Sequence, residues 1–247
     1  YAKQEKNDLL YSMALGYISP AVRFLPARPD GLEHALWQLV TGGITPGRRL
    51  QAFRQYVSLA ESEQAAAQLY QIWEKRELEG KPLSERDEIN LSYQLAIRLP
   101  EKADEIVNEQ LKRISNPDRQ AEYRFISPSV SPRKEVRDSV FEALLVADNR
   151  RIEPWASTAL SLLNHRLRET ESVEYIRPAL EILEEVQRTG DIFFPTAWLR
   201  ALLGGHSSVQ ARDEVEAFYA EYPDFPEMLL NKIRQQADHL YRLHAGE

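Results

Sequence analysis

Apolar residues recur three or four positions apart over most of the chain. The segment 172–190, SVEYIRPALEILEEVQRTG, contains five of them in this spacing: Val173, Ile176, Leu180, Leu183 and Val186. Such spacing places the side chains on one face of a helix. The segments 135–147 (EVRDSVFEALLVA) and 62–80 (SEQAAAQLYQIWEKRELEG) repeat the pattern. We predict a helix in each of the three.

The residues between these segments are typical of helix ends. Thr45-Pro46 and Ser131-Pro132 fit an N-cap followed by proline at the first helical position, where the missing N–H matters least. Four glycines follow apolar runs, where a left-handed C-terminal cap is expected; they are Gly42, Gly80, Gly190 and Gly204.

No run of alternating β-branched residues predicts a convincing strand. The best strand candidate is YRFISPSV, residues 123–130, and Pro128 interrupts it, so a strand there would be short or at an edge. The pattern therefore predicts an all-α fold of roughly a dozen helices. Short connections make successive helices antiparallel neighbours.

Two helices with their turns take about 40 residues, close to a HEAT or armadillo repeat. We therefore predict a HEAT/armadillo-like superhelical array, although no sequence self-similarity supports a strict repeat. The longest stretch without clean periodicity is 115–132. We interpret it as a kink inside a single helical domain, 1–247, and not as a boundary between domains.

Composition narrows the function classes. The 247 residues are 43% hydrophobic and 28% charged, as in a folded protein, and the formal net charge is −7. An acidic chain is a poor partner for nucleic acid. No apolar run reaches the roughly 18 residues of a membrane span. The chain has no cysteine, which excludes disulfides and cysteine-ligated metal, and leaves the compartment open. It begins at Tyr1 without a signal-like stretch, and we expect it to be a piece of a longer polypeptide.

The sequence contains no recognisable catalytic motif. Five histidines are present, and none belongs to a His-Glu-x-x-His zinc motif; they are His34, His165, His206, His239 and His244. We expect His206 to be a capping or packed residue, and His239 and His244 to lie at a surface helix end. No phosphate-binding loop or nucleophile elbow is present. The glutamates at 181, 184 and 185 are typical of a solvated helix face.

One segment is locally basic. Between residues 112 and 138 the chain carries seven basic and four acidic residues, and residues 116–138 contain three prolines and three serines. The basic residues are Lys112, Arg113, Arg119, Arg124, Arg133, Lys134 and Arg137. On composition alone, the last three fit a solvated turn between helices.

Five stretches of the sequence resemble one protein family. ISNPDRQAEYRF is followed by SPSVSPRKEVRDSVFEAL and ADNRRIEPWASTALSLLNH; then come SVEYIRPALEILEEVQRTGDIFFPTAWLRALLGGHSS and YPDFPEMLLNKIRQQADHLYR. Together they resemble the C-terminal region of bacterial zinc aminopeptidases of the aminopeptidase N type, the gluzincins. The resemblance covers 115–243; residues 1–114 match only in helical character.

The resemblance implies a non-catalytic helical domain. It would close over a zinc-containing catalytic domain of the same polypeptide, which lies outside this chain, and would contact the tail of a peptide substrate. Zinc would belong to that missing domain; this chain would hold no metal and have no catalytic residue. The resemblance also implies candidate substrate-binding residues, Arg119 and Arg124, whose guanidinium groups suit a peptide carboxylate or carbonyl. Arg119 has an alternative interpretation, in which it holds its own loop through backbone carbonyls or caps a helix C-terminus.

Two other function classes stay open. A free-standing HEAT-like scaffold would present a helical groove to a protein partner. A stand-alone enzyme is the weakest candidate, because the chain lacks the metallopeptidase motif.

Overall fold

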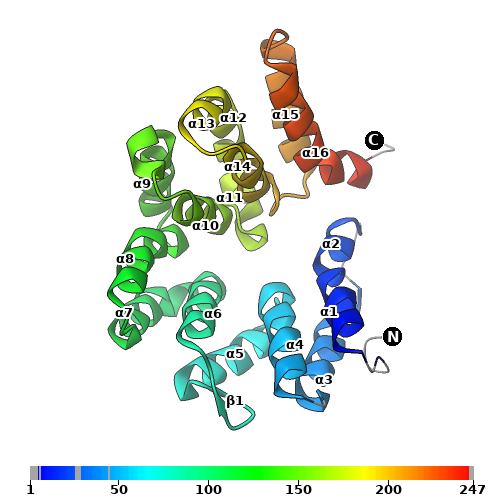
Figure 1. The fold of residues 1–247 in the computed structure, drawn as a ribbon, viewed down its shortest axis with the longest axis vertical. Coiled ribbons are helices and arrows are strands. Elements are labelled where there is room, and N and C mark those ends of the chain that lie inside the picture. Colours follow the sequence, from blue (N-terminus) through cyan, green and yellow to red (C-terminus); the bar gives the residue numbers. More distant parts are fainter. Residues whose placement is uncertain (1–4, 6, 26–28, 44, 245–247) are drawn as a thin grey trace. The chain divides into compact units, whose positions relative to one another are not determined.

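A computed structural model describes residues 5, 7–25, 29–43 and 45–244 (Figure 1). Within these residues the chain forms sixteen α-helices, five short 3₁₀ helices and one hairpin of two-residue strands. The predicted all-α class is confirmed. Tyr1, on which the expectation of a longer polypeptide rests, lies outside the described residues. The chain divides into two compact units, Tyr1–Leu99 and Pro100–Glu247.

The first unit contains six helices and the hairpin within its described part. In chain order they are α1 (Asp8–Gly16), α2 (Ile18–Arg23), α3 (Leu32–Gly42), α4 (Pro46–Leu59), α5 (Glu63–Lys75), β1 (Glu77–Leu78), β2 (Lys81–Pro82) and α6 (Glu85–Arg98). The two strands pair antiparallel, with Leu78 opposite Lys81. Helix α4 packs against α1, α2, α3 and α6 and is the centre of this unit.

The second unit contains ten α-helices and five 3₁₀ helices in the residues described. They are η1 (Pro100–Lys102), α7 (Ala103–Arg113), α8 (Pro117–Ile126), η2 (Ser127–Val130), α9 (Lys134–Leu145), η3 (Ala147–Arg150), α10 (Glu153–Leu163), η4 (Arg166–Arg168), α11 (Glu169–Ser172), η5 (Val173–Tyr175), α12 (Ile176–Glu181), α13 (Leu183–Thr189), α14 (Phe194–Leu203), α15 (Val209–Glu221) and α16 (Glu227–Leu243).

Helices of the second unit pack in two rows. Helix α14 lies between α10 and α16, and α12 packs against α15. Helices that follow each other in the sequence also pack together: α9 contacts α10, α13 contacts α14, and α15 contacts α16. In the row formed by α10, α14 and α16, each helix therefore contacts the helix that precedes it in the sequence and its neighbour in the row.

The core of the second unit gathers around α14. Trp198 is completely buried, and its indole Nε1 donates a hydrogen bond to the Ala179 carbonyl, 3.1 Å away. Phe194, Leu199 and Leu202 from the same helix are also buried in this cluster. An aromatic of this size contributes about 3–5 kcal/mol relative to alanine.

The predicted core faces are largely confirmed. In the segment 172–190, Ile176, Leu180, Leu183 and Val186 are all buried. The segment is not one helix, however, because it divides into η5, α12 and α13. Pro178 has no N–H to donate to the carbonyl of the fourth residue before it. The chain before Ile176 therefore forms a 3₁₀ turn, and Pro178 lies in the first turn of α12. We have no physical account of the second break, at Ile182.

Of the two predicted caps, one is confirmed and one is wrong. Thr45 caps α4: its hydroxyl accepts the Arg48 N–H at 3.3 Å, and Pro46 is the first helical residue. Ser131 does not cap α9. Its hydroxyl accepts the N–H of Arg133 at 3.2 Å, which forms a tight turn, and the helix begins only at Lys134.

None of the four predicted glycines is a left-handed helix cap. Gly42 ends α3 inside the helix, while Gly190 and Gly204 have negative φ. Gly80 has φ +72° but lies in the β1–β2 turn; the left-handed cap of α5 is Arg76, with φ +60°. At Gly190 the reason for glycine is space, because a Cβ there would lie 2.4 Å from Cδ1 of Phe194.

The strand candidate at 123–130 is wrong, since these residues form the end of α8 and all of η2. Pro128 occupies the first turn of η2, where its missing N–H is tolerated. The stretch 115–132 lies wholly inside the second unit.

Candidate functional site

Two buried arginines hold the serine–proline loop that follows α8. Arg168, from η4, donates to the carbonyls of Ser129 and Val130 at 3.3 and 2.9 Å. Arg137, from α9, donates to the carbonyls of Ser131 and Pro132 at 2.8 and 3.0 Å. Four successive backbone acceptors are therefore satisfied by two guanidinium groups, as buried carbonyls require.

The charge of Arg137 acts on the buried guanidinium of Arg168. Burial, together with the charge of Arg137, lowers the pKa of Arg168 to about 10. Arg137 forms an ion pair with Glu171 of α11. This carboxylate partly offsets the effect on Arg168. The prediction of a solvated turn is therefore wrong for Arg137, which is 3% exposed, because its guanidinium replaces water as the donor to the loop.

The other basic residues of this turn are exposed. Arg133 pairs with Asp104 at 2.8 Å, and Lys134 pairs with Asp138 at 2.9 Å. The Tyr175 hydroxyl donates a hydrogen bond to Asp138 at 2.5 Å, and its ring stacks on Phe141. These two contacts join α9 to η5. Burial would raise the pKa of Asp138, but hydrogen bonds from Tyr175 and Lys134 outweigh it and lower the pKa.

The candidate residue Arg119 lies in the first turn of α8. Asn116 caps this helix by accepting the Arg119 N–H at 3.1 Å, and Gln120 donates to the Ile114 carbonyl at 2.7 Å. The entry into the helix is thus fixed by an asparagine, a glutamine and the backbone of Arg119. The Arg119 side chain is exposed.

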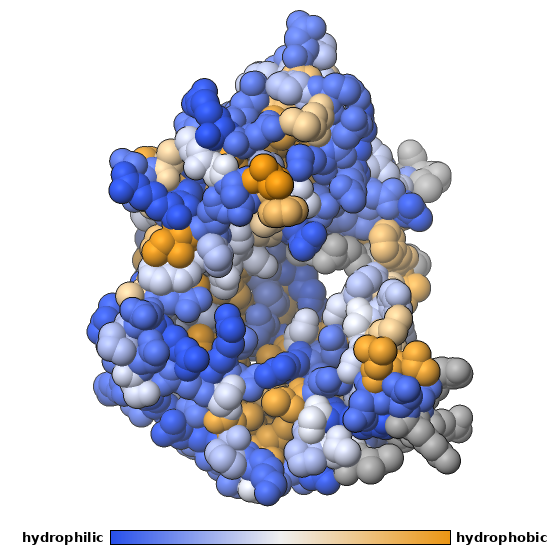
Figure 2. Space-filling view, in the orientation of Figure 1, coloured by the Kyte–Doolittle hydropathy of each residue, from blue (hydrophilic) through white to orange (hydrophobic). Residues whose placement is uncertain are grey.

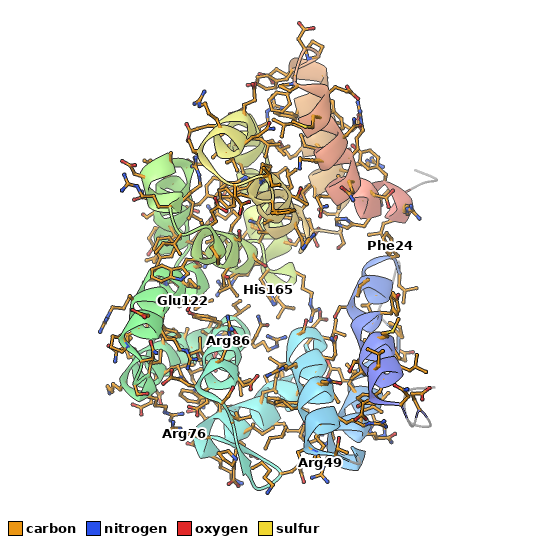
Figure 3. The ribbon with its side chains drawn as sticks, in the orientation of Figure 1. Phe24, Arg49, Arg76, Arg86, Glu122 and His165 are labelled. Carbon is orange, nitrogen blue, oxygen red and sulfur yellow. The ribbon has the colours of Figure 1, made fainter. Side chains whose placement is uncertain are left out.

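The candidate residue Arg124 lies in the last turn of α8 and is also exposed. Its Nη2 lies 3.5 Å from Oε1 of Gln120, one turn earlier. Residues five apart are rotated by about 140° around a helix, so Arg119 and Arg124 lie on different sides of α8. The structure does not bring them together. Figure 3 shows Glu122, which occupies α8 between them.

A second polar cluster joins the loop after α14 to two other helices. His206 is 1% exposed, and its Nε2 lies 2.9 Å from Oδ1 of Asn164, the residue that ends α10. His239, from α16, contacts the His206 carbonyl through Nε2 at 3.0 Å. The prediction of a packed His206 is confirmed. The prediction of a surface position is wrong for His239, which is buried because its imidazole satisfies this carbonyl.

The same loop is also held by a carboxylate. Glu169 accepts the backbone N–H groups of Ser207 and Ser208 and the Ser207 hydroxyl, the last at 2.9 Å. His244 reaches the Ser207 carbonyl at 2.8 Å. Burial would raise the pKa of Glu169, but these hydrogen bonds outweigh it and lower the pKa. His165, labelled in Figure 3, starts η4 with its Nδ1 accepting the Leu167 N–H. These side chains therefore serve to hold backbone.

A pocket of about 190 Å³ lies beside α14 in the second unit. Its lining residues are Ala147, Asp148, Arg150, Arg151, Glu153, Thr189, Gly190 and Phe194. Arg150 is buried over the Trp198 ring, donates to the Leu144 carbonyl at 2.7 Å and pairs with Glu185. Half of the lining residues are charged, so the pocket is polar. A volume of 190 Å³ is smaller than the roughly 300 Å³ of typical small-molecule sites.

Helix α1 carries apolar residues on two faces. Tyr11 and Leu15 are buried against the first unit, whereas Leu9, Leu10 and Met13 are exposed. Tyr17, Phe24 and Leu25 follow and are exposed as well. Figure 2 shows hydrophobic surface over α1 and a separate hydrophobic patch near the end of α2, where Figure 3 labels Phe24. We call the six exposed residues the α1 face.

Two acidic residues of α6 are buried in the first unit. Asp87 accepts two hydrogen bonds from Arg54, at 2.8 and 3.2 Å, and Glu88 pairs with Arg76 at 3.0 Å. Figure 3 shows Arg76 beside the hairpin. Burial would raise the pKa of Asp87, but Arg54 and Ser84 lower it. Both carboxylates therefore serve to join α6 to its neighbours.

No group of three or more metal-binding side chains occurs in the part of the chain that the structure describes. None of its described helices is long and apolar enough to cross a membrane.

No known protein family, curated protein or solved structure matches this chain.

Sequence reasoning missed Arg150 and Arg168. Each contacts groups distant in the chain, since Arg168 lies 38 and 39 residues from its acceptors. No local pattern distinguishes them from exposed arginines. The one available signal was the Ser-Pro-Ser-Val-Ser-Pro run, whose irregular backbone needs donors from elsewhere.

Proposed function

We propose that this chain is a non-catalytic helical domain of a zinc-dependent aminopeptidase. The zinc-containing catalytic domain would belong to the same polypeptide, and the helical domain would close its cavity and contact the peptide tail. The proposal rests on the resemblance of 115–243 to gluzincin C-terminal regions. The observation that carries it is the rigid start of α8, which presents Arg119 with an exposed side chain.

The packing of the second unit supports the finer fold proposal, a HEAT-like array. The rows α10, α14, α16 and α12, α15 are what stacked helical hairpins would form. A curved array of this kind offers a long face for an extended peptide. The two-row packing is therefore compatible with a lid over an active site.

Arg119 suits a peptide's C-terminal carboxylate better than the other arginines of its segment. Arg137 and Arg168 are buried and hold carbonyls of their own loop. Arg124 lies about 140° away on α8, in its last turn, whereas Arg119 lies in the turn that Asn116 fixes. A single peptide tail would therefore contact Arg119 or Arg124, and we propose Arg119.

The two exposed arginines provide a matched pair of variants in the polypeptide that carries the catalytic domain. We expect Arg119→Ala to raise KM for peptides of four or more residues by about 10-fold, because a charged hydrogen bond is lost. Its effect on an aminoacyl chromogenic substrate should be small. Arg124→Ala changes the same charge on the same helix and should leave both unchanged. Equal kinetics for the two variants would contradict the role of Arg119.

The α1 face supports contact with another domain. A helix that is apolar on both sides is normally covered on both sides. Six exposed apolar side chains between Leu9 and Leu25 also exceed the scattered apolar residues of an ordinary surface. We propose that the catalytic domain of the same polypeptide covers this face.

The proposed function is tested by the sequence encoded upstream of Tyr1. It should contain His-Glu-x-x-His followed by a glutamate ligand, and the encoded polypeptide should bind zinc. An open reading frame without this motif would remove the aminopeptidase proposal. The α1 face would then favour the second candidate, a free-standing interaction scaffold, which a stoichiometric partner in pull-down experiments would support.

A further inference from the structure

Ile192 and Phe193 are the most exposed large apolar side chains in the described residues, at 78% and 73%. Their backbone is nonetheless firmly held. Asp191 accepts the N–H groups of Phe193 and Phe194 at 2.7 and 2.9 Å, and Glu153 accepts the Asp191 N–H at 2.8 Å. Two carboxylates thus fix a turn that exposes two large apolar side chains.

The turn stands at the edge of the 190 Å³ pocket. Gly190 and Phe194, on either side of Asp191–Phe193, line it together with residues of η3. The pocket is too small for a typical small-molecule ligand but comparable to one large side chain. A projecting side chain and a hollow therefore lie next to each other on one surface.

The exposed rim carries one charge of each sign. Asp148 and Arg151 line the pocket and pair with each other at 2.8 Å, while their side chains are 79% and 77% exposed. An exposed pair of this kind contributes little to the fold. Val146, just before η3, and Ile152, just before α10, are further exposed apolar residues. We call Val146, Asp148, Arg151, Ile152, Ile192 and Phe193 the Phe193 surface.

We propose that the Phe193 surface binds the Phe193 surface of a second copy of this chain, related by a two-fold axis. In a two-fold interface each residue meets its complement twice. Ile192 and Phe193 of each copy pack against the exposed Val146 and Ile152 of the other, and Asp148 of each copy pairs with Arg151 of the other. The exchange needs exposed apolar side chains and one charge of each sign, all of which this surface has.

The area is sufficient for a stable dimer. If the six side chains lose about 110 Å² each on average, each copy buries roughly 660 Å², somewhat below the ~800 Å² per partner of standard interfaces. Phe193 is then the central aromatic of the interface, the type of residue that carries most of the binding energy.

Sedimentation equilibrium of the 247-residue chain, from about 1 to 100 µM, tests the proposal. We expect a monomer–dimer equilibrium, and Phe193→Arg should weaken it at least about 30-fold. Met228→Arg, at an exposed apolar position on α16, is the matched control and should not change the dissociation constant. Circular dichroism checks that each variant is folded.

The charges provide an independent test. Asp148→Arg and Arg151→Asp should each weaken self-association, because like charges then face each other. An equimolar mixture of the two variants should recover dimers. Position 148 of one variant then faces position 151 of the other, and in each such pair one side chain is basic and the other is acidic. A monomer at every concentration, a dimer unaffected by Phe193→Arg, or a mixture that stays monomeric would overturn the proposal.

Discussion

His206 is built into the second unit as a neutral imidazole. Its Nε2 faces the carbonyl oxygen of the Asn164 side chain, whose amide nitrogen donates to the Leu160 carbonyl at 2.9 Å. The proton of the neutral ring must therefore be on Nε2. The other ring nitrogen, Nδ1, is buried without a hydrogen-bond partner. A second proton at Nδ1 would place a charge where nothing accepts it.

This geometry predicts a stability that falls in acid. Burial, and secondarily the charge of His239, lower the pKa of His206 to about 4, although Glu169 opposes the shift. An unfolded histidine titrates near pH ~6.5, so the unfolded chain binds more protons between about pH 6.5 and 4. The contribution is fully present above about pH 6.5 and is lost as the pH falls towards 4. The loss amounts to roughly 3 kcal/mol.

Urea unfolding of wild type and His206→Gln, followed by circular dichroism at several pH values from about 7.5 to 4.5, measures this loss. Glutamine keeps a donor for Asn164 but does not titrate. We expect the variant's free energy of unfolding to fall less steeply, by up to about 1.4 kcal/mol per pH unit. His34→Gln, at an exposed histidine on α3, should follow the wild type. Parallel curves for wild type and His206→Gln would refute the reasoning.

Three further substitutions test the packing that holds the candidate site. Gly205→Ala should lower the free energy of unfolding by about 3 kcal/mol or more, because its Cβ would lie 1.7 Å from the Asn164 carbonyl oxygen. The control Gly47→Ala should lower it little, because its Cβ would meet only the Thr45 hydroxyl, at 4.0 Å. Asn116→Ala removes the cap of α8 and should cost about 1 kcal/mol, which aspartate at the same position should restore. Arg168→Met leaves two buried carbonyls without their donor and should cost about 2 kcal/mol, despite relief of the buried charge. Urea midpoints near pH ~7.5 measure all three, and an unchanged midpoint for any of them would contradict its contact.

Helix positions and core faces could be predicted from the sequence because they depend on local periodicity. Ile176, Leu180, Leu183 and Val186 are buried as their spacing predicts, even though their segment divides into three short helices. Helix ends were predicted less well. They depend on which donor reaches which carbonyl, and Arg76, not a glycine, provides the left-handed cap of α5.

The candidate site shows the same limit more clearly. Arg119, Arg133 and Arg137 have the same side chain and lie in one basic segment, yet the first two are exposed and the third is buried. The difference comes from the carbonyls of Ser131 and Pro132, to which Arg137 donates. Long-range needs of this kind leave no local pattern. Among the seven basic residues of this segment, Arg137 therefore serves the segment's own backbone, while Arg119 extends from a helix start that other residues fix.

The most direct measurement for the proposed function compares two proteins in one assay. Zinc content and release of N-terminal residues from peptides would be measured for the polypeptide encoded with its upstream sequence, and for the 247-residue chain alone. The proposal predicts about one zinc and steady turnover for the longer polypeptide, and neither for the chain alone. A longer polypeptide without zinc and turnover, or a 247-residue chain with both, would contradict it.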